Sequence, residues 1–310
     1  MNVMRRALLA GSQSVWLREQ ALRYGFVRRS VSRFMPGERM DDALEACRRL
    51  QAEGPGTIVT HLGENLTSAA EAEAVTEHYG KVLQRIDDSG LNTQISVKLT
   101  ELGLDLDPEL CYRNLVVLAE QGSRLGNFIW IDMEATPYVD PTLDLFRRAI
   151  DRWRNLGICL QAYLYRSVAD LESLLPLGPA IRLVKGAYME SAEVAYPRKQ
   201  DVDANFYALS VRLLSDAARS RGARLGIGTH DPRLVGRLQD LIKSTGVPRD
   251  TYEFEMLYGI QRGLQSRLIR DGWPLRVLIS YGEYWFPWYM RRLAERPANV
   301  AFILRSMVAR

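Results

Sequence analysis

Eight short apolar segments, rich in β-branched residues, recur along the chain and constrain its fold more than any other feature. Stretches with helical spacing, such as residues 141–157, lie between them. Strands that alternate with helices predict βαβ units and a parallel sheet, and eight such units favour a closed (β/α)8 barrel. The predicted strands are 57–62, 94–99, 128–134, 158–165, 181–188, 224–230, 252–258 and 275–282.

Two further features support a barrel over an open sheet. The sequence contains no GxGxxG and no GxxxxGK[ST] motif, which are the phosphate loops of the common open-sheet folds. Its 310 residues fit one barrel of about 250 residues with an extension. Residues 1–52 have helical spacing, and Gly54 is the predicted end of the last helix before the first strand. We therefore predict a helical arm over 1–52 and a catalytic barrel, with C-terminal helices, over 53–310.

Composition excludes several classes of protein. The chain has 41 Lys+Arg against 37 Asp+Glu, a net charge of +4, with no basic stripe that would predict nucleic-acid binding. No apolar run approaches the ~18 residues that a membrane span needs. The three cysteines, Cys47, Cys111 and Cys159, are far apart and form no CxxC motif, which indicates a reducing compartment. These features predict a cytoplasmic protein without disulfides.

Polar residues stand near the ends of nearly all the predicted strands. In a (β/α)8 barrel the active site lies at the C-terminal ends of the strands, so these side chains are expected at one mouth. The alternative is structural: pairs such as Lys98–Asp132 or Arg182–Glu255 would only neutralise one another. The residues are His61, Lys98, Asp132, Glu134, Gln161, Arg182, Lys185, Thr229, His230, Glu255 and Tyr281.

Three reaction classes use such a mouth. A metal-dependent hydrolase needs clustered imidazoles, but the chain has three histidines and no HxH pair, so no metal site is predicted. A Schiff-base enzyme would use Lys98 or Lys185. A cofactor oxidoreductase would hold an electron-accepting ring and its pyrophosphate with cationic and amide groups, and Arg182, Lys185 and Gln161, with Thr229 and His230, suit a flavin.

Several strings together resemble the monofunctional bacterial proline dehydrogenases. They run in the family's order from MPGE at residues 35–38 to the C-terminus: SVKLT, IDMEA, LQAYLYRS, RLVKGAYME, AYPRK, THD, FEMLYGI and YMRRLAERPAN. The resemblance implies a distorted (β/α)8 barrel that binds FAD non-covalently. It also implies oxidation of L-proline to Δ1-pyrroline-5-carboxylate, with electrons passed to a membrane quinone and hence a transient approach to the inner face of the membrane.

The resemblance also implies roles for individual residues. Lys98 and Asp132 match substrate-side residues, Arg291 and Arg292 match the pair that binds the substrate carboxylate, and Arg182 matches the arginine near flavin N5. An ion pair between Asp132 and Lys98 would fix the lysine ammonium. Asp132 and Arg182 are thus the expected catalytic residues. The positions that match FAD contacts are Met133, Gln161, Lys185, Gly186, Ala187, Thr229 and His230, with Glu295 one turn after the arginine pair.

The chain departs from the family at three positions near its last strand. Leu278 and Trp288 stand where the family has tyrosines that pack beside the substrate ring, and Ser280 stands in place of a proline. One interpretation is neutral repacking, in which Tyr281, Tyr284 or Tyr289 takes over the substrate contacts. A second is an altered substrate, namely hydroxyproline, pipecolate or another cyclic or N-substituted amino acid. A third is a catalytically inactive flavin-binding interaction module. The sequence does not indicate an oligomeric state.

Overall fold

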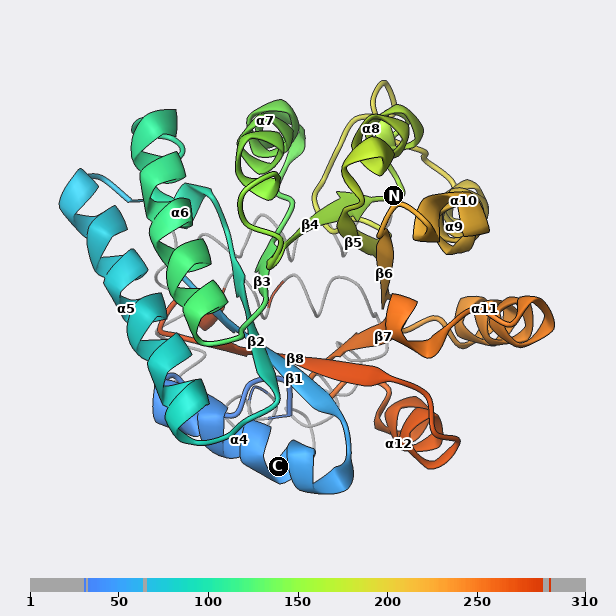
Figure 1. Cartoon of the computed structure of the whole chain (residues 1–310), viewed down its shortest axis with the longest axis horizontal. Helices are drawn as coiled ribbons and strands as arrows, with labels where there is room; N and C mark the ends of the chain where they lie inside the picture. Colours follow the sequence, from blue (N-terminus) through green and yellow to red (C-terminus); the bar gives the residue numbers. More distant parts are fainter. Residues whose placement is uncertain (1–30, 32, 64–65, 287–289, 291–310) are drawn as a thin grey trace, which may run out of the picture.

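Eight parallel strands close into a barrel in chain order in the computed structural model, which describes residues 31, 33–63, 66–286 and 290 (Figure 1). Each strand overlaps one predicted segment, so the predicted fold class is confirmed. The strands are β1 Gly56–His61, β2 Thr93–Val97, β3 Ile129–Ile131, β4 Leu156–Gln161, β5 Ala180–Val184, β6 Arg224–Gly228, β7 Tyr252–Leu257 and β8 Leu275–Tyr281.

Helices surround the ring of strands, as Figure 1 shows. Several begin at residues that cap them: Ser68, Asp107 and Asp231 each accept a backbone N–H of the first turn. The helices are α4 Met40–Glu53, α5 Ala69–Asp88, α6 Pro108–Arg124, α7 Val139–Ile150, α8 Ser167–Leu174, α9 Lys199–Leu214, α10 Asp216–Arg219, α11 Pro232–Thr245 and α12 Arg262–Arg270, with short 3-10 turns at Thr100–Leu102, Thr136–Tyr138, Leu175–Leu177 and Arg249–Thr251.

Helix α4 precedes the barrel and packs against β1 and β8. Its buried face includes Ala43, Leu44 and Cys47, and it ends at Gly54, whose φ of 115° needs a glycine. The predicted end of this helix is therefore confirmed. The division of the chain at residue 52 stays a prediction, because residues 1–30 and 32 lie outside the described part.

The inside of the barrel is filled differently from its outside. The main apolar core lies between the strands and the helices, whereas a small separate cluster inside the barrel contains Ile58, Trp130 and Ala180 with Leu278 against it. Gly157 makes room for this cluster, since a Cβ there would lie 2.6 Å from the Trp130 ring. The cluster fills the inside of the barrel below its mouth.

The two seams beside β1 differ in length. β1 pairs with β8 over six residues, from Gly56↔Arg276 to His61↔Tyr281, but with β2 only from Thr57↔Thr93 to Val59↔Ile95. Beyond that point the Tyr79 hydroxyl of α5 lies between the strands: it accepts the His61 N–H at 2.9 Å and donates to the Ser96 carbonyl at 3.0 Å. A helix side chain thus replaces a backbone hydrogen bond of the sheet.

Two further predictions concern membrane-spanning helices and disulfide bonds. None of the helices in the described ranges is long and apolar enough to cross a bilayer. All three cysteines are buried and carry free thiols.

Candidate active site

A cavity of about 600 Å³ opens at the C-terminal ends of the strands. Most of the described residues that the sequence predicted for the site line this cavity, although they come from six strands or strand ends. They are Lys98, Asp132, Met133, Gln161, Arg182, Lys185, Gly186, Ala187, Thr229, His230 and Leu278. The barrel thus brings the predicted cofactor and substrate residues to one mouth.

Arg182 on β5 is the centre of a charge network that we call the inner cluster, which contains the buried Ser96, Arg182 and Glu255 and the half-buried Asp132. The guanidinium donates through Nε to Glu255 Oε2 at 2.5 Å and through Nη1 to Asp132 Oδ1 at 2.8 Å and Ser96 Oγ at 2.9 Å. Burial alone would lower the pKa of Arg182, but Glu255 and Asp132 raise it above its ordinary value. Arg182 therefore stays a fixed cation at the floor of the cavity.

The packing around Arg182 fixes its orientation. Its guanidinium carbon lies 4.5 Å from the centre of the Trp130 ring, and Trp130 is held in turn by a hydrogen bond from Nε1 to Gln94 Oε1. Gly226 leaves space for Glu255, because a Cβ there would lie 2.2 Å from Oε1. The Nη2 of Arg182 is buried and has no hydrogen-bond partner among the described residues. This nitrogen can therefore donate to a bound ligand.

Lys98 has a different partner from the one expected. Its Nζ donates to Glu101 Oε1 at 2.6 Å, whereas Asp132 accepts from Arg182 and from Ser96 Oγ. The expected Lys98–Asp132 ion pair is wrong, because the 3-10 turn after β2 carries Glu101 back to Lys98. Burial alone would lower the pKa of Lys98, but Glu101 and Asp132 raise it well above its usual range. Lys98 therefore contributes a permanent positive charge to the cavity.

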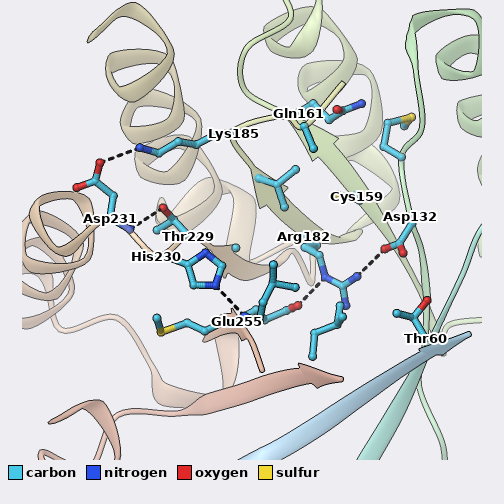
Figure 2. A pocket seen from close by; sticks show the side chains of 18 of the residues that line it. Thr60, Asp132, Cys159, Gln161, Arg182, Lys185, Thr229, His230, Asp231 and Glu255 are labelled. Atoms are coloured by element: carbon cyan, nitrogen blue, oxygen red, sulfur yellow. Dashed lines mark hydrogen bonds and ion pairs between the residues drawn. The ribbon is translucent and has the colours of Figure 1, made fainter. Parts of the chain in front are cut away.

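A second network at the rim, which we call the outer cluster, contains Lys185, Lys199, Asp203 and Asp231. Lys185 Nζ contacts Asp203 Oδ1 at 2.5 Å and Asp231 Oδ2 at 2.9 Å, and Lys199 pairs with the same two carboxylates. Figure 2 shows Lys185 and Asp231 on the opposite side of the pocket from Asp132. The two ammonium groups are thus held next to each other at the entrance.

Asp231 joins the outer cluster to helix α11. Its Oδ1 accepts the Arg233 N–H at 3.1 Å as the N-cap, while Oδ2 binds the two lysines. Burial would raise the pKa of Asp231, but Lys199 and Lys185 lower it well below its ordinary value. Next to it, the Thr229 hydroxyl accepts the Asp231 N–H at 3.2 Å. One helix start thereby orders the whole β6–α11 connection.

Two other residues at the cavity are oriented by backbone groups. The Leu257 N–H donates to Nε2 of His230 at 2.8 Å, so the proton of the neutral ring lies on Nδ1. Gln161 Nε2 donates to the Glu134 carbonyl at 2.7 Å, which fixes its amide. The carboxyl group of Glu134 points elsewhere and accepts from Thr100 Oγ1 at 2.8 Å. Burial raises the pKa of Glu134 to about 7.

Tyr281 and His61 do not line the cavity. Inward and outward side chains alternate along β8, and Leu278 and Ser280 take the inward positions. Tyr281 therefore faces α5, where its hydroxyl lies 2.7 Å from His78 Nε2 and its ring packs on His61. The structure gives no support for Tyr281 as a substrate contact in place of Leu278. Four other predicted residues, Trp288, Arg291, Arg292 and Glu295, lie outside the described residues.

Several side chains of the site were not singled out from the sequence. Ser96, Trp130 and Thr60 each stand two residues before a residue at the mouth, so the period of two along a strand would have placed them inside the barrel. Asp231 precedes Pro232 at the start of a helical stretch, which is a capping signal. Lys199 and Asp203 lie on α9, and no local pattern connects them with Lys185.

Sequence comparisons identify the family. A family model described as proline dehydrogenase matches residues 43–305. Proline dehydrogenase 2 of Bacillus subtilis subsp. natto is 36% identical over 307 residues, which cover 99% of both chains. Proline dehydrogenase of Deinococcus radiodurans is 36% identical over 283 residues, or 90% of each chain.

Solved structures agree on the fold. Proline utilization A (PutA) from Bdellovibrio bacteriovorus, inactivated by N-propargylglycine, superposes with a TM-score of 0.79 at 24% identity, over 86% of this chain. PutA from Corynebacterium freiburgense gives a TM-score of 0.76 at 23% identity, over 99% of this chain. This chain spans about a third of the length of those proteins, 32% and 34% respectively. The match along the whole chain to monofunctional enzymes and the shared barrel show that it belongs to the proline dehydrogenase family, oxidoreductases that act on CH–NH donors.

Proposed function

We propose that this protein oxidises L-proline to Δ1-pyrroline-5-carboxylate with FAD as its cofactor and a quinone as electron acceptor. The observation that carries the proposal is Arg182, a permanent cation fixed at the floor of the cavity, whose Nη2 has no hydrogen-bond partner among the described residues. Family membership adds the substrate class, because the curated relatives are named as proline dehydrogenases.

The residues of the cavity fit a flavin. A dinucleotide carries a pyrophosphate, and Lys185 supplies a cation at the rim, while Gly186 turns the chain with a φ of 114°. The same cavity is lined by Met133, Gln161, Ala187, Thr229 and His230. Glu295, outside the described residues, would complete this set. When bound, FAD supplies a two-electron acceptor at N5 of its ring system.

Lys98 and Asp132 would bind the substrate. An amino acid presents a carboxylate, and Lys98 offers a point charge for it, with Arg291 and Arg292 as the proposed bidentate partners. Hydride transfer from the carbon next to the ring nitrogen needs that nitrogen unprotonated and the carbon held near the acceptor. Asp132 and Glu255 hold the Arg182 guanidinium from two sides. The fixed cation can therefore favour negative charge that develops on a bound acceptor.

The acceptor and the location in the cell follow from the proposed reaction. A quinone lies in the membrane, so a cytoplasmic enzyme must approach the inner face of the membrane during each turnover. Leu278 and Ser280 in the cavity wall favour a second candidate, oxidation of a related cyclic amino acid by the same chemistry.

The absorbance spectrum of the purified protein tests the proposal. We expect flavin bands that bleach when L-proline is added without oxygen and return when a soluble quinone is added. A yellow protein that no cyclic amino acid bleaches would indicate an inactive flavin-binding module. A protein that remains colourless after incubation with FAD would overturn the cofactor assignment.

A further inference from the structure

One buried carboxylate connects Lys98 with the start of the β1–α5 connection. Glu101 Oε1 accepts a hydrogen bond from Lys98 Nζ at 2.6 Å and another from the Gly63 N–H at 3.2 Å. The Glu101 side chain is 1% exposed, and its second oxygen, Oε2, has no hydrogen-bond partner among the described residues. Lys98 lines the cavity, whereas Glu101 is not among the described residues that do so. Glu101 therefore acts on a bound ligand through Lys98.

The turn that carries Glu101 is fixed by the protein itself. This 3-10 turn, Thr100–Leu102, follows β2 and ends at Gly103, whose φ of 101° favours glycine. Asn114 of α6 is buried, and its Nδ2 donates to the Leu102 carbonyl at 3.0 Å. The carboxylate is thus held in place without a ligand.

Several other titratable groups lie around the Lys98 ammonium. Asp132 and Glu134 follow β3 on one side of β2, and His61 ends β1 on the other. Both carboxylates accept hydrogen bonds from other side chains, and burial lowers the pKa of His61 to about 4, so its ring is neutral above that pH. Among the described residues, Glu101 is therefore the one group that forms an ion pair with Lys98.

The charge of Glu101 controls the charge of Lys98. Burial alone would lower the pKa of the Lys98 ammonium, whereas its ion pair and hydrogen bond with Glu101 raise it, together with the charges of Asp132 and Glu134. Loss of the Glu101 charge should therefore lower the pKa of Lys98 below the ordinary lysine value of about 10.4. A neutral amine attracts a carboxylate much less than an ammonium group does.

We propose that Glu101 is a positioning residue, which keeps the Lys98 ammonium charged and directed at the carboxylate of the bound substrate. Glu101 does not touch the substrate, and its effect passes through one lysine. The inference rests on the proposed function, which assigns Lys98 to the substrate carboxylate. The substitution Glu101→Gln removes the charge but keeps the shape and an acceptor oxygen, so it should weaken binding of a carboxylate most at alkaline pH.

Calorimetric binding of cyclopentanecarboxylate to the purified holoprotein measures this effect without turnover. The acid has the ring size and the carboxylate of proline but no nitrogen, so its charge is constant above about pH 7. The measurement runs from about pH 8 to pH 10, because Glu134, with a pKa of about 7, is ionised throughout this range. Burial raises the pKa values of Tyr79 and Tyr281, which lie near Glu101, so both stay neutral.

Over this range the affinity of wild type should change by less than about twofold, and that of Glu101→Gln should fall at least about threefold. Glu101→Asp keeps the charge on a shorter side chain, so its alkaline loss should lie between those two. The double variant Lys98→Met/Glu101→Gln, which has neither charge, should bind weakly and show no alkaline loss. Glu120→Gln, exposed on α6, is the matched control and should behave as wild type.

An alkaline loss of equal size in wild type and Glu101→Gln would overturn the inference, and so would the same loss in the double variant, because the titrating group would then not be Lys98. A wild type that does not bind the acid would also overturn it, since Lys98 would not be a carboxylate site. If the variants bind the acid as expected, but L-proline never bleaches the bound flavin, the proposed function fails and the inference stands.

Discussion

The inner and outer clusters contain the same kinds of charged groups but differ in burial and in the elements that hold them. In the inner cluster, one cation on β5 faces two carboxylates, and the side chains of Arg182 and Glu255 are 4% and 3% exposed. In the outer cluster, two lysines face two aspartates at strand and helix ends, and Lys199 is 70% exposed. Ion pairs in water contribute little, whereas a buried charge that loses its partner is costly. Burial, and not the number of ion pairs, should therefore decide which cluster the fold depends on.

The largest effect is expected for Arg182→Met. This substitution leaves Glu255 and Asp132 without their cation, and the loss of one partner of a buried pair destabilises by about 3–5 kcal/mol. Urea unfolding of the variant and the wild type measures the difference. Arg182→Lys is the matched control, which keeps the charge but not the forked geometry and should lose less. Equal stability of wild type and Arg182→Met would contradict the importance of burial.

Crowding the inner cluster is a second way to break it. Gly226→Ala places a Cβ 2.2 Å from Glu255 Oε1 and must displace that carboxylate, at a cost of about 1–3 kcal/mol. Gly236→Ala on α11 is the control, because nothing lies within 4 Å of an added Cβ and alanine favours helix by about 0.5–1 kcal/mol. Thermal unfolding should therefore shift in opposite directions for the two variants.

The contributions of the two clusters to the free energy of unfolding should also change with pH in opposite directions. Burial raises the pKa of Glu255 to about 7 despite Arg182, so its contribution to stability is present at low pH and is lost as the pH rises from about 4.5 to about 7. The pKa of Asp231 is lowered by its lysines, so its contribution is lost as the pH falls below the ordinary aspartate value of about 4. The free energies of unfolding of wild type, Glu255→Gln and Asp231→Asn should be measured between about pH 2 and pH 8, a range that includes both titration windows.

Each variant should flatten the pH dependence of unfolding in one window only, by on the order of 1–2 kcal/mol. Asparagine is as good an N-cap as aspartate, so Asp231→Asn changes the charge while it keeps the cap of α11. If Glu255→Gln flattened the acid window, or Asp231→Asn the neutral one, the assignment of the two signs would be wrong.

The smallest effect is expected for Lys199→Met. Its ammonium is mostly in water, so its loss should cost less than about 1 kcal/mol, and about 0.5 M salt should remove most of the difference. Lys185→Met removes the less exposed of the two ammonium groups, so it should cost more and depend less on salt. Urea unfolding at low and high salt measures both effects. A larger loss of stability for Lys199→Met than for Lys185→Met would contradict the prediction that the more exposed lysine contributes less.

The barrel was predictable because its strands are marked locally. Runs such as 57–62 are apolar and β-branched, and the helix that follows, α5, carries polar residues, so both the order and the positions of the strands could be derived from the sequence. Side chains alternate between the inside and the outside of the barrel along each strand, and this alternation directs Lys98, Arg182 and Leu278 into the cavity.

The partners of these residues could not be predicted in the same way. Lys98 was expected to pair with Asp132 on the next strand, but the 3-10 turn at Thr100–Leu102 returns Glu101 to it. Tyr281 lies one residue beyond the inward Ser280, and the alternation along β8 directs it outward to His78. Lys199 and Asp203 reach Lys185 only because α9 lies beside the mouth, and such long-range placement leaves no local signal.

The Tyr79 hydroxyl between β1 and β2 also has a consequence for motion. The amide hydrogen of His61 is bound to a helix side chain and not to a neighbouring strand, so it is released when α5 moves, even if the sheet stays intact. Hydrogen exchange at this single amide therefore reports the separation of α5 from the barrel. Exchange at Val59, farther from this opening, reports the unfolding of the sheet itself.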